Sequence, residues 1–530
     1  MKAYKKLIFL MAIVATLASC DANLDKNNPN SLTVDSYYQS SEDLATAVNA
    51  VYAVLQDQTL VSREWFFVHD LRGDDMATGG GQLETPRAQL LNGAGDASNF
   101  VSNSVWKGCF GLIGRANAII ELAPKAKVTN AALTARTVAE AKFLRAWAYF
   151  EAVSLWGDVP LYNEYVKTLD GVKARAASTD VYTSIIGNLT DAIAVLPASY
   201  AGSDKGRATK AAAQMLLARV YMQRGAAGDY ASALTLLQAI VGSGLYGLTD
   251  NYNDNFMEET EYNKESIFEV GFMDSNAAFS WGYNLGDGLG AETTVHNQEI
   301  NPTTWGNLIP SRSLLEEFEV VGVNGATKTD PRYKFSFYEA GDAMFNGNIG
   351  DDKDGYRFNI ASSVVRGGAA KKVGWRKHTI LYKSIASYYP GGVNERIMRY
   401  ADVLLLLAEC QNETGASAAA VTTLNMVRDR ASVAMPHYGT PAMDGLYPVD
   451  TKINILKAIA HERRVELNGE EIRNRDILRW RAQDKLVGAG KIYATDPISY
   501  FVKNKYELLP IPQATLDSNP LISGHQNPGY

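Results

Sequence analysis

A set of oppositely charged residues near the C-terminus is the first place in this sequence where side chains could perform chemistry. Its members alternate in sign at helical spacing: Glu462, Arg463, Glu466, Arg473, Asp476 and Arg479. Two carboxylates about 5–10 Å apart across a cleft could act as the acid and base of a glycosidase. The same spacing is typical of ion pairs that hold helices together. We interpret the set as structural, because no recognised catalytic motif accompanies it.

Aromatic side chains in segments without helical periodicity are better suited to binding, and their natural ligand is a sugar. Sugar rings stack their C–H faces on flat aromatic rings, while Asp, Asn and Arg hydrogen-bond the hydroxyls at the rim. The candidate ligand-binding residues are Trp65, His69, Arg72, Asp74, Asp75, Trp281, Tyr283, Asn284, Trp305, Arg366, Trp375, Tyr388 and Tyr389. Because most large aromatic residues are buried, we expect at least two of them, rather than all, to line the site.

Four other tryptophans fall on helical or motif positions, where we expect them in the core: Trp106, Trp147, Trp156 and Trp480.

Metal, cofactor and nucleophilic chemistry find no support in the motifs. The acidic run DDKDG (351–355) fails as an EF-hand, because the register that fits Gly355 puts Ala361 at the last ligand position. The run GDGLG (286–290) lacks the strand–turn–helix context of a phosphate-binding loop. The six histidines are scattered along the chain, so we expect no metal and no cofactor.

Amphipathic helices must position these residues. Phe143, Trp147, Phe150 and Val153 recur at offsets of four, three and three, which predicts a helix over 136–156. The same reasoning with capping and breaking residues predicts a partner helix over 178–197 and three further helix pairs: 209–222 with 230–241, 399–413 with 417–431, and 453–468 with 470–481. The pairs resemble tetratricopeptide repeats, although their consensus is degenerate. The sequence therefore predicts a mainly α-helical fold.

Two stretches lack this periodicity. The shorter one covers about 60–105, and the longer one, 247–395, is rich in Gly, Asn, Asp and aromatic residues, with short pieces at 266–271 and 311–318. Long irregular segments of compact proteins are usually binding loops. We therefore expect an N-terminal helical region at 36–246 with an insert at 60–105, an irregular ligand-binding subdomain at 247–395, and a C-terminal helical region at 396–530.

The first 35 residues predict export and lipid anchoring. Lys2, Lys5 and Lys6 precede an apolar stretch at 7–17 that is typical of a secretory signal and too short to span a membrane. It ends in Leu-Ala-Ser-Cys, which resembles a bacterial lipobox and predicts cleavage after residue 19 and lipid on Cys20. Residues 20–35 would then form a polar tether, and several acyl chains would anchor the protein to the membrane.

The net charge and the cysteines narrow the classes of protein to which the chain could belong. The net charge of -7 over 530 residues argues against nucleic-acid binding. Cys109 and Cys410, the other cysteines, lie in apolar stretches and are expected to be buried free thiols. A disulfide between them is the alternative in an exported protein, although nothing in the sequence places the two close together.

Several motifs, taken in order along the chain, resemble those of the SusD/RagB family. They are AEAKFLRAWAYFEAVSLWGDVPL (139–161), GRATKAAAQMLLARVYM (206–222), NERIMRYADVLLLLAEC (394–410), HERRVELNGEEIRNRDILRW (461–480), LLPIPQ (508–513) and QNPGY (526–530). The resemblance implies four tetratricopeptide-like helix pairs that form a scaffold, packed against an irregular loop-rich subdomain. It also implies a non-catalytic lipoprotein of the outer membrane, exposed at the cell surface, that binds an oligosaccharide above a SusC-type TonB-dependent transporter.

Two other functions remain open at this stage. A peptide-binding lid of a peptide importer would need deep polar pockets for an extended backbone, whereas stacking surfaces favour sugars. A surface glycosidase would need a carboxylate pair that no motif marks.

Overall fold

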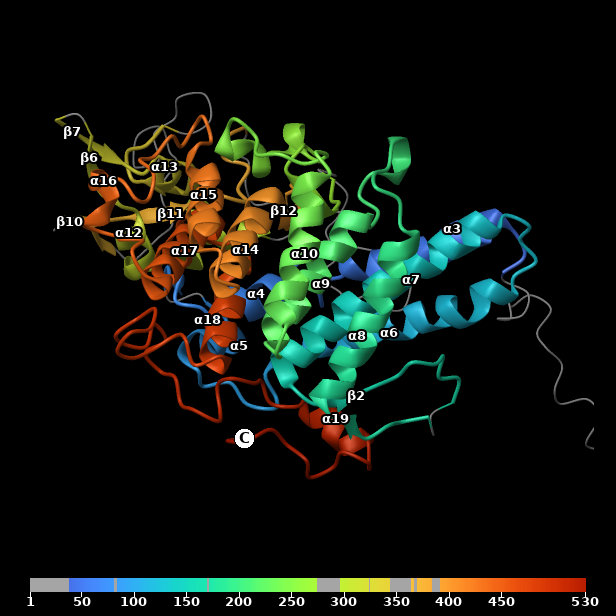
Figure 1. Ribbon diagram of the computed structural model, residues 1–530. Coiled ribbons are helices and arrows are strands. Elements are labelled where there is room, and N and C mark those ends of the chain that lie inside the picture. Colours follow the sequence, from blue (N-terminus) through green and yellow to red (C-terminus); the bar gives the residue numbers. More distant parts are fainter. Residues whose placement is uncertain are drawn as a thin grey trace, which may run out of the picture.

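The computed structural model of the chain is built mainly of α-helices, and its strands form two-stranded antiparallel pairs (Figure 1). This confirms the mainly α-helical prediction. The structure describes residues 38–80, 83–168, 171–273, 296–323, 325–343, 364–366, 369–383 and 391–530.

A series of helices forms the scaffold, and each member packs on the next. In order, the series is α3 (Ser41–Leu55), α6 (Phe100–Leu122), α7 (Ala131–Trp156), α8 (Ser178–Val195), α9 (Lys210–Arg224), α10 (Asp229–Gly242), α14 (Tyr400–Glu413) and α15 (Ser417–Arg428). Local signals set the ends of these helices. The Thr209 side chain caps α9 by accepting from the Ala212 N–H, and Gly225 ends it at a φ of +63°. The pairs predicted at 209–241 and 399–431 are confirmed to within a few residues.

The last predicted pair is arranged differently. Helix α17 (Lys452–Leu467) packs on α14 and α15, whereas α18 (Arg473–Ala482) packs on α4 (Glu64–Asp70). Between them Gly469 and Glu471 take left-handed φ angles of +65° and +56°, which turn the chain away from α17. The fourth helix pair of the scaffold is α3 with α6.

The segment 60–105 is not the irregular insert that the sequence predicted. It holds α4, β1 (Met76–Thr78), α5 (Thr85–Asn92) and the start of α6. All seven residues of α4 are buried, so the helix has no polar face and leaves no amphipathic period in the sequence.

The described middle of the chain has only short elements, and the short pieces predicted at 266–271 and 311–318 are a strand and a helix. Strand β4 (Ser266–Val270) pairs with β12 (Glu395–Arg399), which leads directly into α14. The remaining elements of the middle segment are α11 (His296–Ile300), β5 (Leu308–Pro310), α12 (Arg312–Glu317), β6 (Val320–Val323), β7 (Ala326–Thr329), α13 (Arg332–Ser336), β8 (Phe337–Glu339), β9 (Val364–Arg366), β10 (Ala369–Lys371) and β11 (Val373–Trp375). In Figure 1, β6, β7 and β10 lie at the end of the molecule opposite α3.

Other short elements flank the scaffold: β2 (Val159–Pro160) with β3 (Arg175–Ala176), α16 (Pro441–Asp444) and α19 (Gln513–Ser518).

The core contains the residues that the sequence assigned to it. Trp106, Trp147, Trp156 and Trp480 are buried. Cys109 and Cys410 are buried free thiols, as predicted. Among the described residues, no helix combines the length and apolar character needed to cross a membrane.

Candidate ligand-binding site

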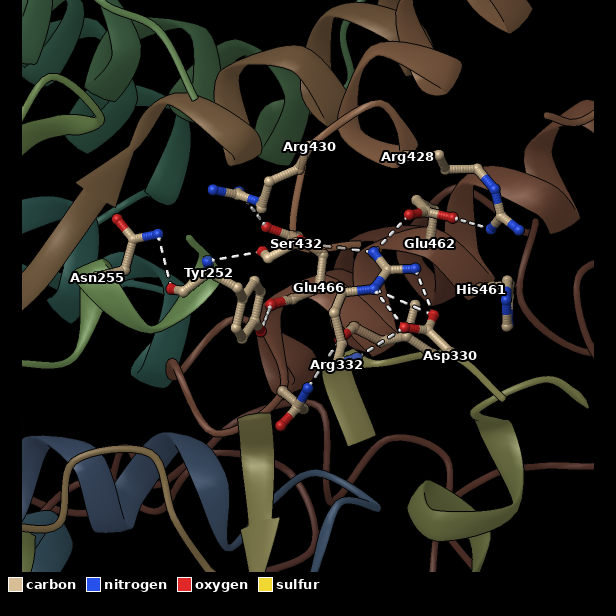
Figure 2. A network of polar contacts seen from close by, with 12 residues as sticks. Tyr252, Asn255, Asp330, Arg332, Arg428, Arg430, Ser432, His461, Glu462 and Glu466 are labelled. Carbon is tan, nitrogen blue, oxygen red and sulfur yellow. Dashed lines mark hydrogen bonds and ion pairs between the residues drawn. The ribbon is translucent and has the colours of Figure 1, made fainter. Parts of the chain in front are cut away.

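The charged residues of the C-terminal motif are all buried. Figure 2 shows Glu462 and Glu466 among their partners. Glu462 and Glu466 are one helical turn apart on α17, and both face Arg332 at the start of α13. The Arg332 guanidinium also donates to Asp330 at 2.6 Å, and all four side chains are fully buried. The cluster therefore joins α17 to the middle segment.

Two more arginines complete the surroundings of Glu466. Arg399 and Arg430 each lie 2.8 Å from one carboxylate oxygen of Glu466, and each also pairs with Glu265 at 2.8 Å. Burial alone would raise the pKa of Glu466, but Arg430, Arg399 and Arg332 hold it well below its usual range. Every charge is paired, so the cluster offers no ionised group to a substrate.

His461 carries a positive charge in the same region. Its Nδ1 and Nε2 lie 2.7 and 2.9 Å from the carboxylates of Glu317 and Glu319. Burial lowers the pKa of His461, but these two carboxylates outweigh it and raise the pKa to about 9. With both ring nitrogens occupied, His461 has a structural role, in keeping with the interpretation of this motif.

The first two candidates for ligand binding are in the core. Trp65 is 3% exposed and packs against His69, with ring centroids 5.3 Å apart, and against Trp147 at 6.2 Å. The Nε2 of His69 lies 2.9 Å from Glu151, and burial together with Arg475 lowers the pKa of His69 to about 4. No ring face is open for a sugar, so this structure contradicts the prediction for Trp65 and His69.

The polar candidates beside them hold the fold together. Asp74 pairs with Arg473 at 2.6 Å, and the buried Asp75 pairs with Arg464 at 2.8 Å. Arg72 donates to the backbone oxygen of Tyr506 at 2.9 Å. These contacts tie the chain after α4 to the C-terminal region and favour a structural role for Asp74 and Asp75. Arg72 is only partly buried and stays a predicted contributor to ligand binding.

Trp375 is also a core residue. It is 0% exposed, its ring centroid is 5.2 Å from that of Phe337, and a Cβ on Gly469 would come within 2.8 Å of its ring. Sequence context suggested a loop aromatic, but β11 carries the ring into the interior, and the prediction for Trp375 is wrong.

For six other candidates the structure describes no side chain. Arg366 is the last residue of β9, where it pairs with Ala369 of β10. The remaining five lie outside the described residues: Trp281, Tyr283, Asn284, Tyr388 and Tyr389.

Trp305 is the candidate aromatic that the described structure leaves partly exposed. It lies between α11 and β5, and the backbone here meets the end of β1 very closely. A Cβ on Gly79 would fall 1.8 Å from the Gly306 oxygen, so only glycine fits there. The Gly79 N–H also donates to the Asn307 oxygen at 2.9 Å. Trp305 therefore lies beside the turn that follows β1.

Buried polar contacts hold this turn in place. Glu299 of α11 accepts from Arg63 at 3.2 Å and from the Asn307 side chain at 2.9 Å. Arg63 also lies 3.7 Å from Glu84, whose side chain is 56% exposed, and Thr78 at the end of β1 is exposed. We call Trp305, Thr78 and Glu84 the Trp305 surface. It combines an aromatic ring with hydrogen-bonding groups, as sugar recognition requires.

Sequence reasoning missed a second aromatic surface. A cavity of about 440 Å³ is lined by Trp106, Phe110, Tyr162 and Tyr165, with Glu164 at its edge. Its volume is within the range of ligand pockets. The i, i+4 spacing of Trp106 and Phe110 was the available signal, but the structure was needed to bring Tyr162 and Tyr165 to the same place. We call this the aromatic groove.

Histidines that are far apart in the sequence meet in the structure. Among the described residues, two groups bring their ligand atoms within 4.8 Å of one another: His296, His378 and Glu395, and Asp70, His296 and Glu471.

Comparison with known proteins agrees with the helical scaffold and its motifs. Residues 264–530, half of the chain, match the profile of the family described as "SusD family". The chain belongs to the SusD family. A second profile, described as "Starch-binding associating with outer membrane", matches residues 23–222. The family motifs of the sequence fall within these two matches.

Individual relatives cover nearly the whole SusD family chain. SusD-like protein P2 of Formosa agariphila is 27% identical over 100% of both chains. A crystal structure of a SusD-like protein from Bacteroides fragilis superposes with a TM-score of 0.73 at 23% identity, covering 95% of this chain and 100% of the other. A structure described as a laminarin binding SusD-like protein has a TM-score of 0.71 at 25% identity, covering 93% and 100%.

Proposed function

We propose that this SusD family protein binds a glycan at the cell surface and passes it on for import without cleaving it. The observation that carries the proposal is the match of residues 23–222 to a family described as starch-binding and associating with the outer membrane. The relative described as laminarin binding, at 25% identity, supports the same class of ligand.

The Trp305 surface is the proposed place of capture. The partly exposed ring of Trp305 would stack on a sugar face, and Thr78 and Glu84 would bond its hydroxyls. A single ring with a few polar partners gives weak binding, on the order of −4 to −8 kcal/mol, which is millimolar to micromolar. Trp281, Tyr283, Asn284, Tyr388 and Tyr389 remain proposed contributors.

Anchoring and partnership complete the proposal. Lipid on Cys20 would hold the protein on the outer membrane, facing outwards. A SusC-type TonB-dependent transporter would receive the glycan beneath it. Co-purification of such a transporter with the chain from outer membranes would support this part.

The function is tested by isothermal titration of the detergent-extracted protein with laminarin, starch oligosaccharides and short peptides, with analysis of the products afterwards. We expect heat of binding from one glycan class, no signal from peptides and no shortened sugars. Binding to peptides alone would move the protein to a peptide importer. Release of shorter sugars that stops when one carboxylate is replaced would make it a glycosidase.

A further inference from the structure

A buried cluster of two histidines and three carboxylates lies where the scaffold meets the middle segment. Its members come from five separate segments: Asp70 ends α4, His296 begins α11, His378 follows β11, Glu395 begins β12 and Glu471 precedes α18. Each residue is at most 5% exposed. Charged groups at this depth are normally paired, bonded or neutralised.

In two of the carboxylates, one oxygen lacks such a partner. Asp70 and Glu471 offer ligand oxygens that lie within 4.8 Å of each other and of a ring nitrogen of His296. One Asp70 oxygen accepts the Glu471 N–H at 3.2 Å. The other Asp70 oxygen, Oδ2, and Oε1 of Glu471 have no hydrogen-bond partner among the described residues. Two buried carboxylate oxygens near His296 thus have no hydrogen-bond partner among the described residues.

The histidine beside them is held in one orientation. His296 Nδ1 lies 2.9 Å from a Glu395 oxygen. Its ring is stacked between Phe66, at 4.1 Å between centroids, and His378, at 4.3 Å. The second Glu395 oxygen lies 3.3 Å from His378 Nδ1. With Nδ1 directed at Glu395, Nε2 is the nitrogen of His296 that faces away from that carboxylate.

The two carboxylates oppose one another electrostatically. Both are buried, and two like charges repel each other strongly in a dry interior. A cation between them would keep both groups ionised and would remove this repulsion. The neighbouring cations are already engaged: Lys377 pairs with Glu470 at 2.8 Å, and Arg475 pairs with Glu151 at 2.6 Å.

We propose that Asp70, His296 and Glu471 bind a divalent transition-metal ion, with Zn²⁺ as the best match, and that Glu395 orients His296 for it. Imidazole nitrogen with carboxylate oxygens suits Zn²⁺, whereas Ca²⁺ prefers six to eight oxygens. A ligating histidine usually donates its other ring N–H to a carboxylate, which is the position of Glu395. Because Zn²⁺ bonds at about 2.0–2.2 Å, the ligand atoms would close slightly on binding.

The ion would connect three separate segments of the chain: α4, α11 and the turn before α18. Since α11 leads directly to Trp305, the ion would also stabilise the segment that carries the Trp305 surface. The metal proposal does not depend on which ligand that surface binds.

The test is metal content after refolding. The full chain is extracted in detergent and unfolded in denaturant that contains EDTA. It is then refolded with or without ZnCl₂ and desalted, and its zinc content is measured by mass spectrometry. We expect about one zinc per chain and a raised unfolding temperature in the zinc sample. Refolding with CaCl₂ should leave the unfolding temperature unchanged.

Variants separate the site from adventitious binding. His296→Gln, and the double variant Asp70→Asn with Glu471→Gln, should each lose zinc by about tenfold or more, because ligands are removed. The matched control is His461→Gln, which removes a histidine that also lies between two carboxylates but is bonded at both nitrogens. It should keep its zinc.

Wild-type protein that refolds without retaining zinc would overturn the proposal, and the two carboxyls would then share a proton. Equal zinc in the wild type and in His296→Gln would also overturn it. If the double variant does not fold, the zinc content of the wild type and of His296→Gln still tests the proposed site.

Discussion

Arg332 donates to Glu466 at 3.1 Å, and this contact joins the first residue of α13 to the C-terminal end of α17. Both side chains are fully buried. The irregular middle segment, which carries Trp305, is therefore bound to the helical scaffold by charge as well as by apolar packing. That arrangement gives the loops a rigid base without any helix of their own longer than six residues among the described ones.

Loss of Arg332 should be strongly destabilising. Arg332→Met leaves Asp330, Glu462 and Glu466 with fewer cations in a dry interior, at a cost of about 3–5 kcal/mol in the free energy of unfolding. Chemical denaturation measures this change. The control is Arg312→Met, whose guanidinium is 65% exposed and pairs with Glu316 at 2.7 Å. The control should change stability by only about 0–1 kcal/mol, and equal effects of the two variants would contradict the account.

Stability should fall in alkali because of His461. Its pKa is about 9 in the folded protein, against 6.5 as the ordinary value. A raised pKa contributes stability that is complete below about pH 6.5 and is lost as the pH rises through about 9. His461→Gln should therefore be less stable than the wild type at pH 6, by about 3 kcal/mol, with the gap closing towards pH 9.5. Urea unfolding of both proteins across this range measures the gap, and a constant gap would argue against a charged His461.

The two buried thiols should resist labelling. Burial raises the pKa of Cys109 and of Cys410 well above the ordinary thiol value, and the reactive species is the thiolate. Native protein treated with a maleimide should therefore carry no label on the peptides that contain these residues, while unfolded protein carries it on both. Labelling of Cys109 before unfolding would mean that α6 is less well packed than the structure has it.

Replacing Trp375 should lower the stability of the protein much more than replacing Trp305. Trp375→Ala removes a ring with 0% exposure and should cost about 3–5 kcal/mol of stability. Trp305→Ala removes a half-buried ring and should cost considerably less. Thermal unfolding of the two variants compares these effects. A larger loss for Trp305→Ala would assign that ring to the core and would remove it from the proposed surface.

Long helices could be predicted from the sequence, and the short buried helix α4 could not. Helix α7 has 26 residues, so the apolar side chains of Phe143, Trp147 and Phe150 recur at helical spacing although most of the helix around them is buried. The residues of α4 are all buried, so its pattern carries no period. Helices α17 and α18 diverge at Glu471, which has a left-handed φ angle. This conformation is uncommon for a glutamate and could not be predicted from the sequence.

The candidate site was only partly predictable for a related reason. Trp65, Trp305 and Trp375 all lie in stretches without helical periodicity. The sequence alone does not show which of these rings packs in the core. Their burial is decided by distant partners such as Trp147 and Gly469. The cluster of Asp70, His296 and Glu471 was invisible because 401 residues separate the first from the last.

The most direct test of the account is a titration of Trp305→Ala with the glycan that the wild type binds. Tyr165→Ala, in the aromatic groove, serves as the matched control, since it also removes a half-buried aromatic ring. Loss of a stacked ring should weaken binding by about tenfold or more, which is about 1.4 kcal/mol. The account predicts this loss for Trp305→Ala and wild-type affinity for Tyr165→Ala. Unchanged affinity in Trp305→Ala would contradict the Trp305 surface, and a loss confined to Tyr165→Ala would move the glycan to the aromatic groove.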